Sequence, residues 1–501
     1  MSELSSLMHG FVTCLTPFNL WMATLGCFLG TIVGVLPGLG PAATIAMLIP
    51  LTYGMDATPA MIMLSCIYYG SKYGGSTTSI LVNLPGESAS VVTAFDGYQL
   101  ARQGRAGSAL GISAIGSFIG GILGTFGLIF LCVPLARFSL KFGPAEYFSL
   151  IIMGMLTIVF VGGQSIKKSL MSGIIGLAIG TIGVDVVEGA PRFVYGINDL
   201  RDGINFILVV MGLFGIGEVF LSAEEHLKTK SLKVKFRELW PSLGDIVESK
   251  WAILRGTLLG FFIGTLPGAG PTLASFMSYG LEKAVAKDPS RFGKGAIEGV
   301  AGPETANNSA TQGNMVPLLA LGIPSSGGTA IMLGALMMYG LKPGPMLFTQ
   351  SPDFVWALMA SMFIGNVILL IMNLPMIPLF AATLRIPYHY LYPVILVICI
   401  IGAYSLHMSL LDPLIMLIFG VIGYFMKKLD IPSAPMAVAL ILGPMLEYSL
   451  YQALAVAYGD VTTFIRRPIS ATLLGIAALM TVIVCFRLVR MKRAMIEDDD
   501  Q

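Results

Sequence analysis

Long runs of apolar residues follow one another along almost the whole chain, and few charged residues interrupt them. A helix needs about 20 apolar residues to cross the hydrocarbon layer of a bilayer. Runs close to that length lie at 106–135, 146–162, 169–188 and 204–222, and again at 354–383, 391–406, 408–426, 433–452 and 469–490. The pattern predicts an all-α protein, a polytopic bundle of helices in a lipid bilayer.

The apolar pattern is broken twice by the same motif. Stretch 34–41 has the sequence Gly-Val-Leu-Pro-Gly-Leu-Gly-Pro, and stretch 264–271 has Gly-Thr-Leu-Pro-Gly-Ala-Gly-Pro. Proline lacks a backbone N–H and glycine opens positive φ, so no regular helix passes through undisturbed. Segments 20–36 and 42–53 are too short for two full spans, which favours a bent or re-entrant hairpin. The helix-break residues are Pro37, Gly38, Gly40, Pro41, Pro267, Gly268, Gly270 and Pro271.

A second pair of breaks follows these motifs. Ser, Thr and Gly residues fill 71–79, ahead of an Asn-Leu-Pro-Gly-Glu sequence at 83–87, and polar residues fill 304–314, ahead of Gly-Ile-Pro-Ser-Ser at 322–326. We interpret both stretches as helix-breaking, so the chain is predicted to contain discontinuous helices. Pro37 precedes Pro267 by 230 residues and Pro85 precedes Pro324 by 239. The further break residues are Pro85, Gly86, Gly322 and Pro324.

The positions of Lys and Arg predict how the two halves are oriented. Cytoplasmic loops carry an excess of these residues. Loop 53–58 before the first polar stretch has none, whereas loop 283–294 before the second is basic, as are 228–237 and the C-terminal tail. We therefore predict two inverted-topology repeats, 1–222 and 251–501, joined by a cytoplasmic basic linker at 223–250, with the N-terminus outside. Four residues do not follow the rule in this arrangement: Arg137, Lys141, Arg466 and Arg467.

Backbone outside a helix persists at membrane depth only when it is buried in protein or lines an aqueous cavity. Paired breaks in inverted halves indicate the substrate site of a transporter. Helix N-termini and polar side chains there suit an anion, and free carbonyl groups suit a cation. The candidate substrate-binding residues are Lys72, Ser76, Thr77, Thr78, Ser79, Asn83, Asn307, Asn308, Ser309, Thr311, Gln312, Ser325 and Ser326.

Each of these assignments has a simpler alternative. Both polar stretches are alternatively ordinary loops at the membrane surface. Glu87 and Asp96 are ionisable and close to the first break, which makes them candidates for ion coupling. Each is equally well interpreted as a solvated residue at a helix end.

Composition narrows the class of function. The 501 residues are 55% hydrophobic and 12% charged, about half the charged fraction of a soluble protein. A net charge of +2 without a long basic tract gives no indication of nucleic acid as a partner. The sequence has no nucleophile elbow, Walker motif or His-Glu-x-x-His motif, which argues against an enzyme. Without an ATP site, uptake is expected to be ion-driven or to depend on another chain. We expect no cofactor beyond a coupling ion, Na⁺ or H⁺, and no other metal.

The motifs resemble one known family. They are the stretch 34–41, the Tyr-Gly-Ser-Lys-Tyr-Gly-Gly-Ser sequence at 69–76, the stretch 83–87, Asp-Gly-Tyr at 96–98, Asn-Asn at 307–308 and Gly-Ile-Pro at 322–324. Together they resemble the large membrane subunit of the bacterial tripartite tricarboxylate transporters over nearly the whole chain. The resemblance implies ion-coupled secondary uptake of a carboxylate across the bacterial inner membrane. It implies two partners, a small four-helix membrane subunit and a periplasmic solute-binding protein.

Several alternatives stay open at the level of sequence. The family includes carriers of tricarboxylates such as citrate, of dicarboxylates and of aromatic acids, so the resemblance does not fix the substrate. The coupling ion is Na⁺ or H⁺. A channel is the nearest rival function, followed by an intramembrane enzyme or an assembly scaffold.

Overall fold

The structure, a computed structural model, describes residues 3–36, 39–161, 165–185, 189–224, 240–268, 270–383 and 388–499. The chain forms two compact units, each made of two separate segments. One unit combines Met1–Ser139 with Ile207–Leu429, and the other combines Leu140–Phe206 with Asp430–Gln501. The division of the chain into repeats at 222 and 251 stays a prediction, since an internal repeat and a compact unit are different properties.

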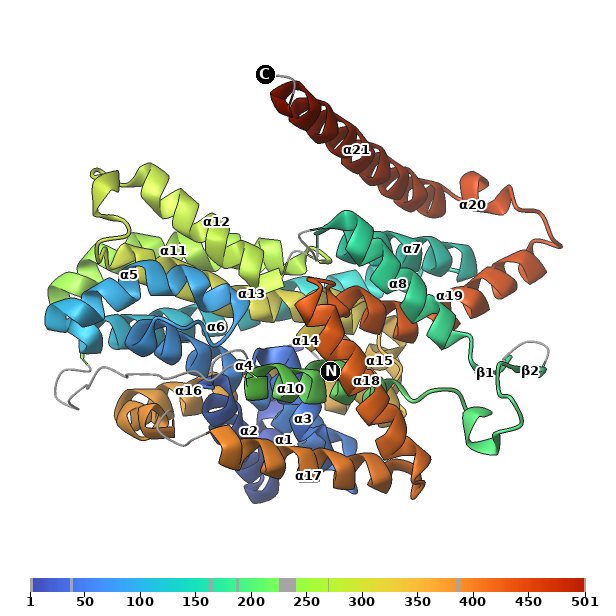
Figure 1. The fold of residues 1–501 in the computed structure, drawn as a ribbon, viewed down its shortest axis with the longest axis horizontal. Helices are drawn as coiled ribbons and strands as arrows, with labels where there is room; N and C mark the ends of the chain where they lie inside the picture. The colour runs from blue at the N-terminus through green and yellow to red at the C-terminus, as the bar shows by residue number, and fades with distance from the viewer. Residues whose placement is uncertain are drawn as a thin grey trace. The chain divides into compact units, whose positions relative to one another are not determined.

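The first unit is helical wherever it has regular structure (Figure 1). Its α-helices are α1 (Glu3–Cys14), α2 (Pro17–Gly34), α3 (Pro41–Leu48), α4 (Ala57–Val82), α5 (Val91–Leu100), α6 (Ala106–Ser139), α9 (Phe206–Val210), α10 (Gly217–Glu224), α11 (Leu243–Thr265), α12 (Gly270–Val285), α13 (Glu298–Leu321), α14 (Gly327–Met338), α15 (Pro345–Gln350), α16 (Pro352–Thr383), α17 (Tyr388–His407) and α18 (Leu411–Lys428). Short helical turns join some of them: η1 (Ile49–Thr52), η2 (Ser88–Ser90), η3 (Ala101–Arg105), η4 (Asn198–Leu200, in the other unit), η5 (Met211–Ile216) and η7 (Pro289–Arg291).

The second unit contains helices and one small hairpin. Its helices are α7 (Pro144–Val161), α8 (Ile166–Gly180), α19 (Ser433–Val456), α20 (Thr463–Arg466) and α21 (Pro468–Asp499). Strands β1 (Gly183–Val184) and β2 (Pro191–Arg192) pair antiparallel, with Gly183 opposite Arg192. The predicted span 169–188 is therefore wrong beyond residue 180, because the chain leaves α8 there and enters the hairpin.

Within the described residues, four helical stretches are long and apolar enough to cross a membrane: Pro17–Gly34, Ser88–Ser139, Pro352–Ile377 and Ser433–Val456. Shorter apolar helices match most of the other predicted spans, among them Pro144–Phe160, Phe206–Leu221, Tyr392–His407 and Pro468–Val484. These elements make the protein an all-α, multi-pass membrane protein. The basic stretch 228–237 of the predicted linker lies outside the described residues.

Helices α4 and α13 form the centre of the first unit. Every residue from Pro59 to Leu81 and from Gly299 to Ala320 is buried, although many of them are polar. Helix α2 packs along α4, and α13 lies between α11 and α12 on one side and α6 on the other (Figure 1). Because neighbouring helices cover them on all sides, α4 and α13 carry polar groups without exposing them to lipid.

The same close packing occurs in both halves of this unit. A Cβ atom on Gly30 or Gly34 would lie 2.4 or 2.5 Å from the carbonyl oxygen of Ile67 or Ser71 in α4. A Cβ atom on Gly260 or Gly264 would likewise lie 2.4 or 2.3 Å from the carbonyl oxygen of Ala306 or Ala310 in α13. The glycines differ by 230 in number and their partners by 239, as the sequence motifs do. The repeat thus extends from motifs to helix packing.

The two polar stretches are continuous helix, which corrects the expectation that they break it. Residues 71–79 lie inside α4, and residues 304–314 lie inside α13. The hydroxyl groups of Ser76 and Thr77 donate to the carbonyl oxygens four residues earlier, and Thr311 does the same. These three hydroxyl groups are therefore satisfied inside their own helix. The glycines serve close packing: a Cβ on Gly74 would meet the Thr31 oxygen at 2.4 Å.

The other predicted breaks are present. Helix α2 ends at Gly34 and α3 begins at Pro41; α11 ends at Thr265 and α12 begins at Gly270. Helix α4 ends at Val82 and α13 ends at Leu321, and the residues that follow, Asn83 and Gly322, are both in the left-handed conformation, with φ of 60° and 74°. Pro37 and Gly38 lie outside the described residues.

Candidate functional site

Two capped helix starts follow the ends of α4 and α13. Glu87 and Ser90 form a capping box ahead of α5, and Ser326 and Thr329 form one ahead of α14. The backbone N–H of Glu87 donates to Ser90 Oγ, and that of Ser326 donates to Thr329 Oγ1. These side chains satisfy N–H groups that a helix start leaves open. The polar side chains around these two helix starts are further donors toward an anion.

The strongest such donor is Lys72, which forms a buried ion pair. Its Nζ lies 2.5 Å from Glu87 Oε2, and each side chain is 3% exposed. The other carboxylate oxygen of Glu87 accepts from Asn307 Nδ2 at 2.8 Å. Lys72 Nζ also lies 5.8 Å from the centre of the Tyr68 ring. A charge buried this deeply is tolerable only with a partner of opposite sign.

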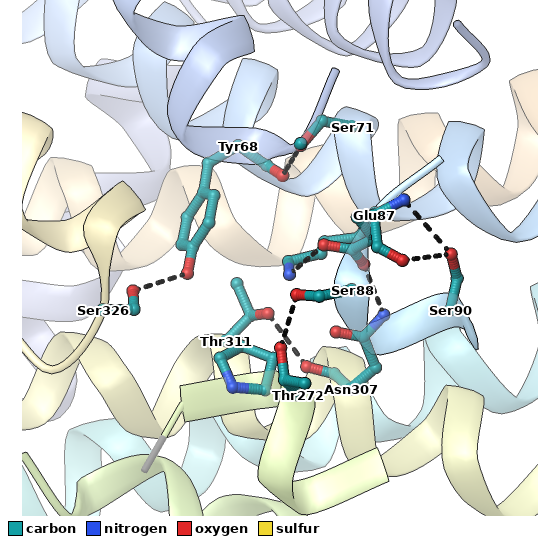
Figure 2. A network of polar contacts seen from close by, with 12 residues as sticks. Tyr68, Ser71, Glu87, Ser88, Ser90, Thr272, Asn307, Thr311 and Ser326 are labelled. Atoms are coloured by element: carbon teal, nitrogen blue, oxygen red, sulfur yellow. Dashed lines mark hydrogen bonds and ion pairs between the residues drawn. The ribbon is translucent and has the colours of Figure 1, made fainter. Parts of the chain in front are cut away.

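Each half of the first unit reaches the helix start of the other half (Figure 2). Tyr68 of α4 contacts Ser326, with 3.4 Å between the two hydroxyl oxygens. Asn307 of α13 contacts Glu87. Tyr68 and Asn307 differ by 239 in number, and so do Glu87 and Ser326, so the two contacts are equivalent in the repeat.

The network borders on residues with access to the surface. Ser88 Oγ lies 2.7 Å from Thr272 Oγ1, a contact between η2 and α12 that is exposed. Ser326 is partly exposed as well. Figure 2 shows Ser88 and Thr272 beside Glu87 and Asn307. The polar cluster of Lys72, Glu87, Asn307, Tyr68 and Ser326 is thus buried on one side and bordered by accessible hydroxyl groups on the other.

Sequence reasoning missed a second buried carboxylate, Glu304 of α13, which is fully buried. Its two oxygens each contact a hydroxyl group, Ser76 from α4 and Thr93 from α5, and Ser113 of α6 interacts with it too. The available signal was an ionisable residue at the head of a polar stretch at membrane depth.

The structure gives Asp96 a role in fixing backbone. Its Oδ1 accepts from the N–H groups of Gly293, Gly295 and Ala296 at 2.7–2.9 Å, and its Oδ2 accepts from the Tyr279 hydroxyl at 2.9 Å. The three backbone donors lie just before α13, and Tyr279 belongs to α12. Asp96 is buried, so it is not a solvated residue at a helix end.

The remaining candidates on α4 lie outside the polar cluster. Thr78 donates to Val35 O and thereby ties α4 to the end of α2. Ser79 donates to Ser90 Oγ and supports the capping box. Thr77 donates to the carbonyl oxygen of Tyr73 in its own helix. Asn83 is exposed and ends α4.

The remaining candidates of the second half also serve packing. Asn308 donates to Ser117 Oγ of α6, and Ser309 donates to Thr257 O of α11. The side chain of Gln312 packs against Gly124, where an added Cβ would lie 3.0 Å from that side chain. Thr311 donates to Asn307 O next to the cluster. Ser325 is buried, and its carbonyl oxygen accepts from the N–H of Gly268.

The proline and glycine motifs shape the backbone near the cluster. Gly40 and Pro41 begin α3, Gly268 and Gly270 have φ of 79° and 58°, and Pro271 is buried in the first turn of α12. Pro85 and Pro324 lie two positions after the left-handed residues Asn83 and Gly322. Pro267 lies at the turn between α11 and α12.

Fold and site define the protein as a multi-pass membrane protein with a charged polar cluster inside its largest unit. Residues 20–438 match the model of the tripartite tricarboxylate transporter TctA family, and the chain belongs to that family.

Two relatives come from Agrobacterium vitis. The chain is 44% identical over 501 residues, all of both chains, to the "Uncharacterized 52.8 kDa protein in TAR-I ttuC' 3'region". It is 43% identical over 242 residues, 48% of this chain and all of the relative, to the "Uncharacterized protein in TAR-II ttuC' 3'region". No solved structure matches the chain.

Proposed function

We propose that this chain is the large, substrate-translocating membrane subunit of a binding-protein-dependent, ion-coupled secondary transporter for carboxylates. A tricarboxylate such as citrate is the first substrate to test, and a dicarboxylate or an aromatic acid is the alternative. Family membership supports the transporter class. The observation that supports a carboxylate as the substrate is the buried Lys72–Glu87 pair, in which Lys72 already binds a carboxyl group.

The pair suggests how a substrate binds. Glu87 receives one charged donor, Lys72, and one neutral donor, Asn307. A substrate carboxylate presents the same two oxygens, so it replaces Glu87 at Lys72 without leaving the buried cation unpaired. The bordering hydroxyl groups of Ser88, Thr272 and Ser326 then offer hydrogen bonds to further polar groups of the acid.

The proposal includes two inverted-topology repeats in the bacterial inner membrane. Recurrence of glycine packing, left-handed helix ends and capping boxes at offsets of 230 and 239 supports a structural repeat. The uneven distribution of Lys and Arg supports opposite orientation. Single cysteines at Thr58 and Ser231, in a cysteine-free variant, should react from opposite sides with an impermeant thiol reagent. Equal labelling of both from the periplasm would rule out the inverted arrangement.

Capture of a dilute acid is assigned to partners, a periplasmic solute-binding protein and a small four-helix membrane subunit. The test is uptake of radiolabelled citrate, one dicarboxylate and one aromatic acid into proteoliposomes, with and without both partners from the same genome. We expect saturable uptake that needs the partners at low substrate concentration and stops when ion gradients collapse. Uptake that does not saturate and ignores the gradient would indicate a channel instead.

A further inference from the structure

Glu304 differs from Glu87, Glu282 and Asp96, three other buried carboxylates of the first unit, in having no cationic or backbone N–H donor among the described residues. Glu87 is paired with Lys72, and Glu282 is paired with Arg255. Asp96 accepts three backbone N–H groups. Glu304, at 0% exposure, contacts hydroxyl groups only.

These pairings also settle the charges around Glu304. Glu87, paired with Lys72, and Tyr73 of α4 interact electrostatically with Glu304, and Glu282, paired with Arg255, packs against Gly302 of α13. The Lys72–Glu87 and Arg255–Glu282 pairs are each neutral as a pair. An unpaired carboxylate at this depth is costly, and a buried carboxyl group avoids that cost by binding a proton.

The hydrogen bonds of Ser76 favour a proton over a bare carboxylate. Its hydroxyl oxygen contacts two acceptors, Glu304 Oε2 and the carbonyl oxygen of Lys72 at 3.1 Å. One hydroxyl has one hydrogen to donate. If Glu304 carries a proton on Oε2, Glu304 donates to Ser76 and Ser76 donates to Lys72 O, so both contacts are hydrogen bonds. Thr93 donates to the other carboxyl oxygen.

We infer that Glu304 is the proton-carrying group of the transporter: it binds a proton at Oε2 and releases it to water on the other side of the membrane in each transport cycle. This inference rests on the proposed function and goes beyond it by naming the coupling ion and its site. The reaction makes and breaks one O–H bond and needs no other reactant.

The position of Glu304 explains how proton and substrate are linked. Ser76, which touches Glu304, lies one helical turn after Lys72 on α4. Thr93, which touches the other oxygen, lies three residues after Ser90 of the Glu87 capping box. A substrate that displaces Glu87 from Lys72 therefore alters both elements that hold the proton site.

The test compares Glu304→Gln with Glu282→Gln in proteoliposomes that contain both partners and a trapped pH-sensitive dye. Glu282 is the matched control because it is as deeply buried, on the neighbouring helix α12. We expect wild type and Glu282→Gln to acidify the lumen when citrate or the identified acid is added. Glu304→Gln, fixed in a neutral form, should lose acidification and accumulation but keep exchange of labelled for unlabelled substrate without a gradient.

Thr93→Val is a second variant, which serves if Glu304→Gln does not fold. Losing a donor to the carboxylate favours the protonated form, so the pH of half-maximal accumulation should rise by about one unit. Unchanged acidification by Glu304→Gln, or wild-type uptake driven by Na⁺ without proton movement, would overturn the inference and leave the proposed function intact. No coupled uptake of any acid by wild type would overturn the proposed function, and this inference with it.

Discussion

The segment from Asn83 to Ser90 and the segment from Gly322 to Thr329 share a backbone and differ in charge. Both begin with a left-handed residue, continue through a proline and end in a capping box. Glu87 in the first corresponds to Ser326 in the second, and Lys72 corresponds to Thr311. The Lys72–Glu87 ion pair therefore has no counterpart at the equivalent positions, Thr311 and Ser326, so two segments of similar backbone differ in the charges that they carry.

The largest effect expected from this difference is at Lys72. Lys72→Ala leaves Glu87 buried without its cation, which costs about 3–5 kcal/mol. Uptake should fall more than about 100-fold. Thr311→Ala, at the equivalent position, removes one neutral hydrogen bond worth about 1 kcal/mol, and uptake should fall less than about tenfold. The measurement is initial uptake into proteoliposomes, corrected for the amount of protein inserted.

A double variant checks the cause of the loss. Lys72→Ala combined with Glu87→Ala removes both charges, so membrane expression should recover relative to Lys72→Ala alone while transport stays lost. Equal losses for Lys72→Ala and Thr311→Ala would show that the two halves contribute alike to transport.

The next effect concerns Gly86 and its counterpart Ser325. A Cβ on Gly86 would lie 2.5 Å from Gly75 Cα and 2.6 Å from Gly34 O, so Gly86→Ala forces two backbones apart. A cost of about 1–3 kcal/mol follows. Ser325 already has a side chain, and its buried Oγ has no partner among the described residues, so Ser325→Ala should be neutral or slightly stabilising.

Thermal unfolding in detergent measures this second pair of variants. Gly86→Ala should lower the midpoint and Ser325→Ala should not. A stable Gly86→Ala protein would mean that α4 and the turn after it approach each other less closely than the structure shows.

Sequence patterns predicted the helix ends at the proline and glycine motifs well because proline and glycine act locally. The left-handed ends at Asn83 and Gly322 and the break before Pro41 follow from residue chemistry alone. The polar stretches were misjudged because burial by neighbouring helices keeps Ser, Thr and Asn helical, and no local signal reports on those neighbours.

The site was predicted only in part for the same reason. Lys72, Asn307, Ser326 and Glu87 do come together, as their motifs suggest. Asn308 and Ser309 point to α6 and α11 instead, because residues adjacent on a helix face different directions. Glu304 became visible only through its contacts with α4 and α5.

A moderate effect is expected where each half contacts the other. Asn307→Ala removes a 2.8 Å hydrogen bond to a charged group, worth about 1.5–3 kcal/mol. The substrate concentration for half-maximal uptake should rise about tenfold to 100-fold. Tyr68→Phe removes a long contact between neutral hydroxyl groups, 3.4 Å apart, and should change that concentration less than about threefold. A larger effect for Tyr68→Phe would place the substrate nearer Ser326 than Glu87.

The smallest expected effect is on stability, and it distinguishes the left-handed residue after α13, Gly322, from the one after α4, Asn83. Alanine in the left-handed region costs about 1–2 kcal/mol relative to glycine, and asparagine tolerates that region better than alanine does. Gly322→Ala should therefore lower the unfolding midpoint by a few degrees, helped by the Pro343 oxygen, which a Cβ would meet at 3.1 Å. Asn83→Ala should cost less because Asn83 is exposed and already has a Cβ, and Asn83→Gly should be neutral or stabilising. If Asn83→Gly instead destabilises the protein more than Gly322→Ala, the Asn83 side chain has a role beyond ending α4, and the first half differs from the second in more than its charges.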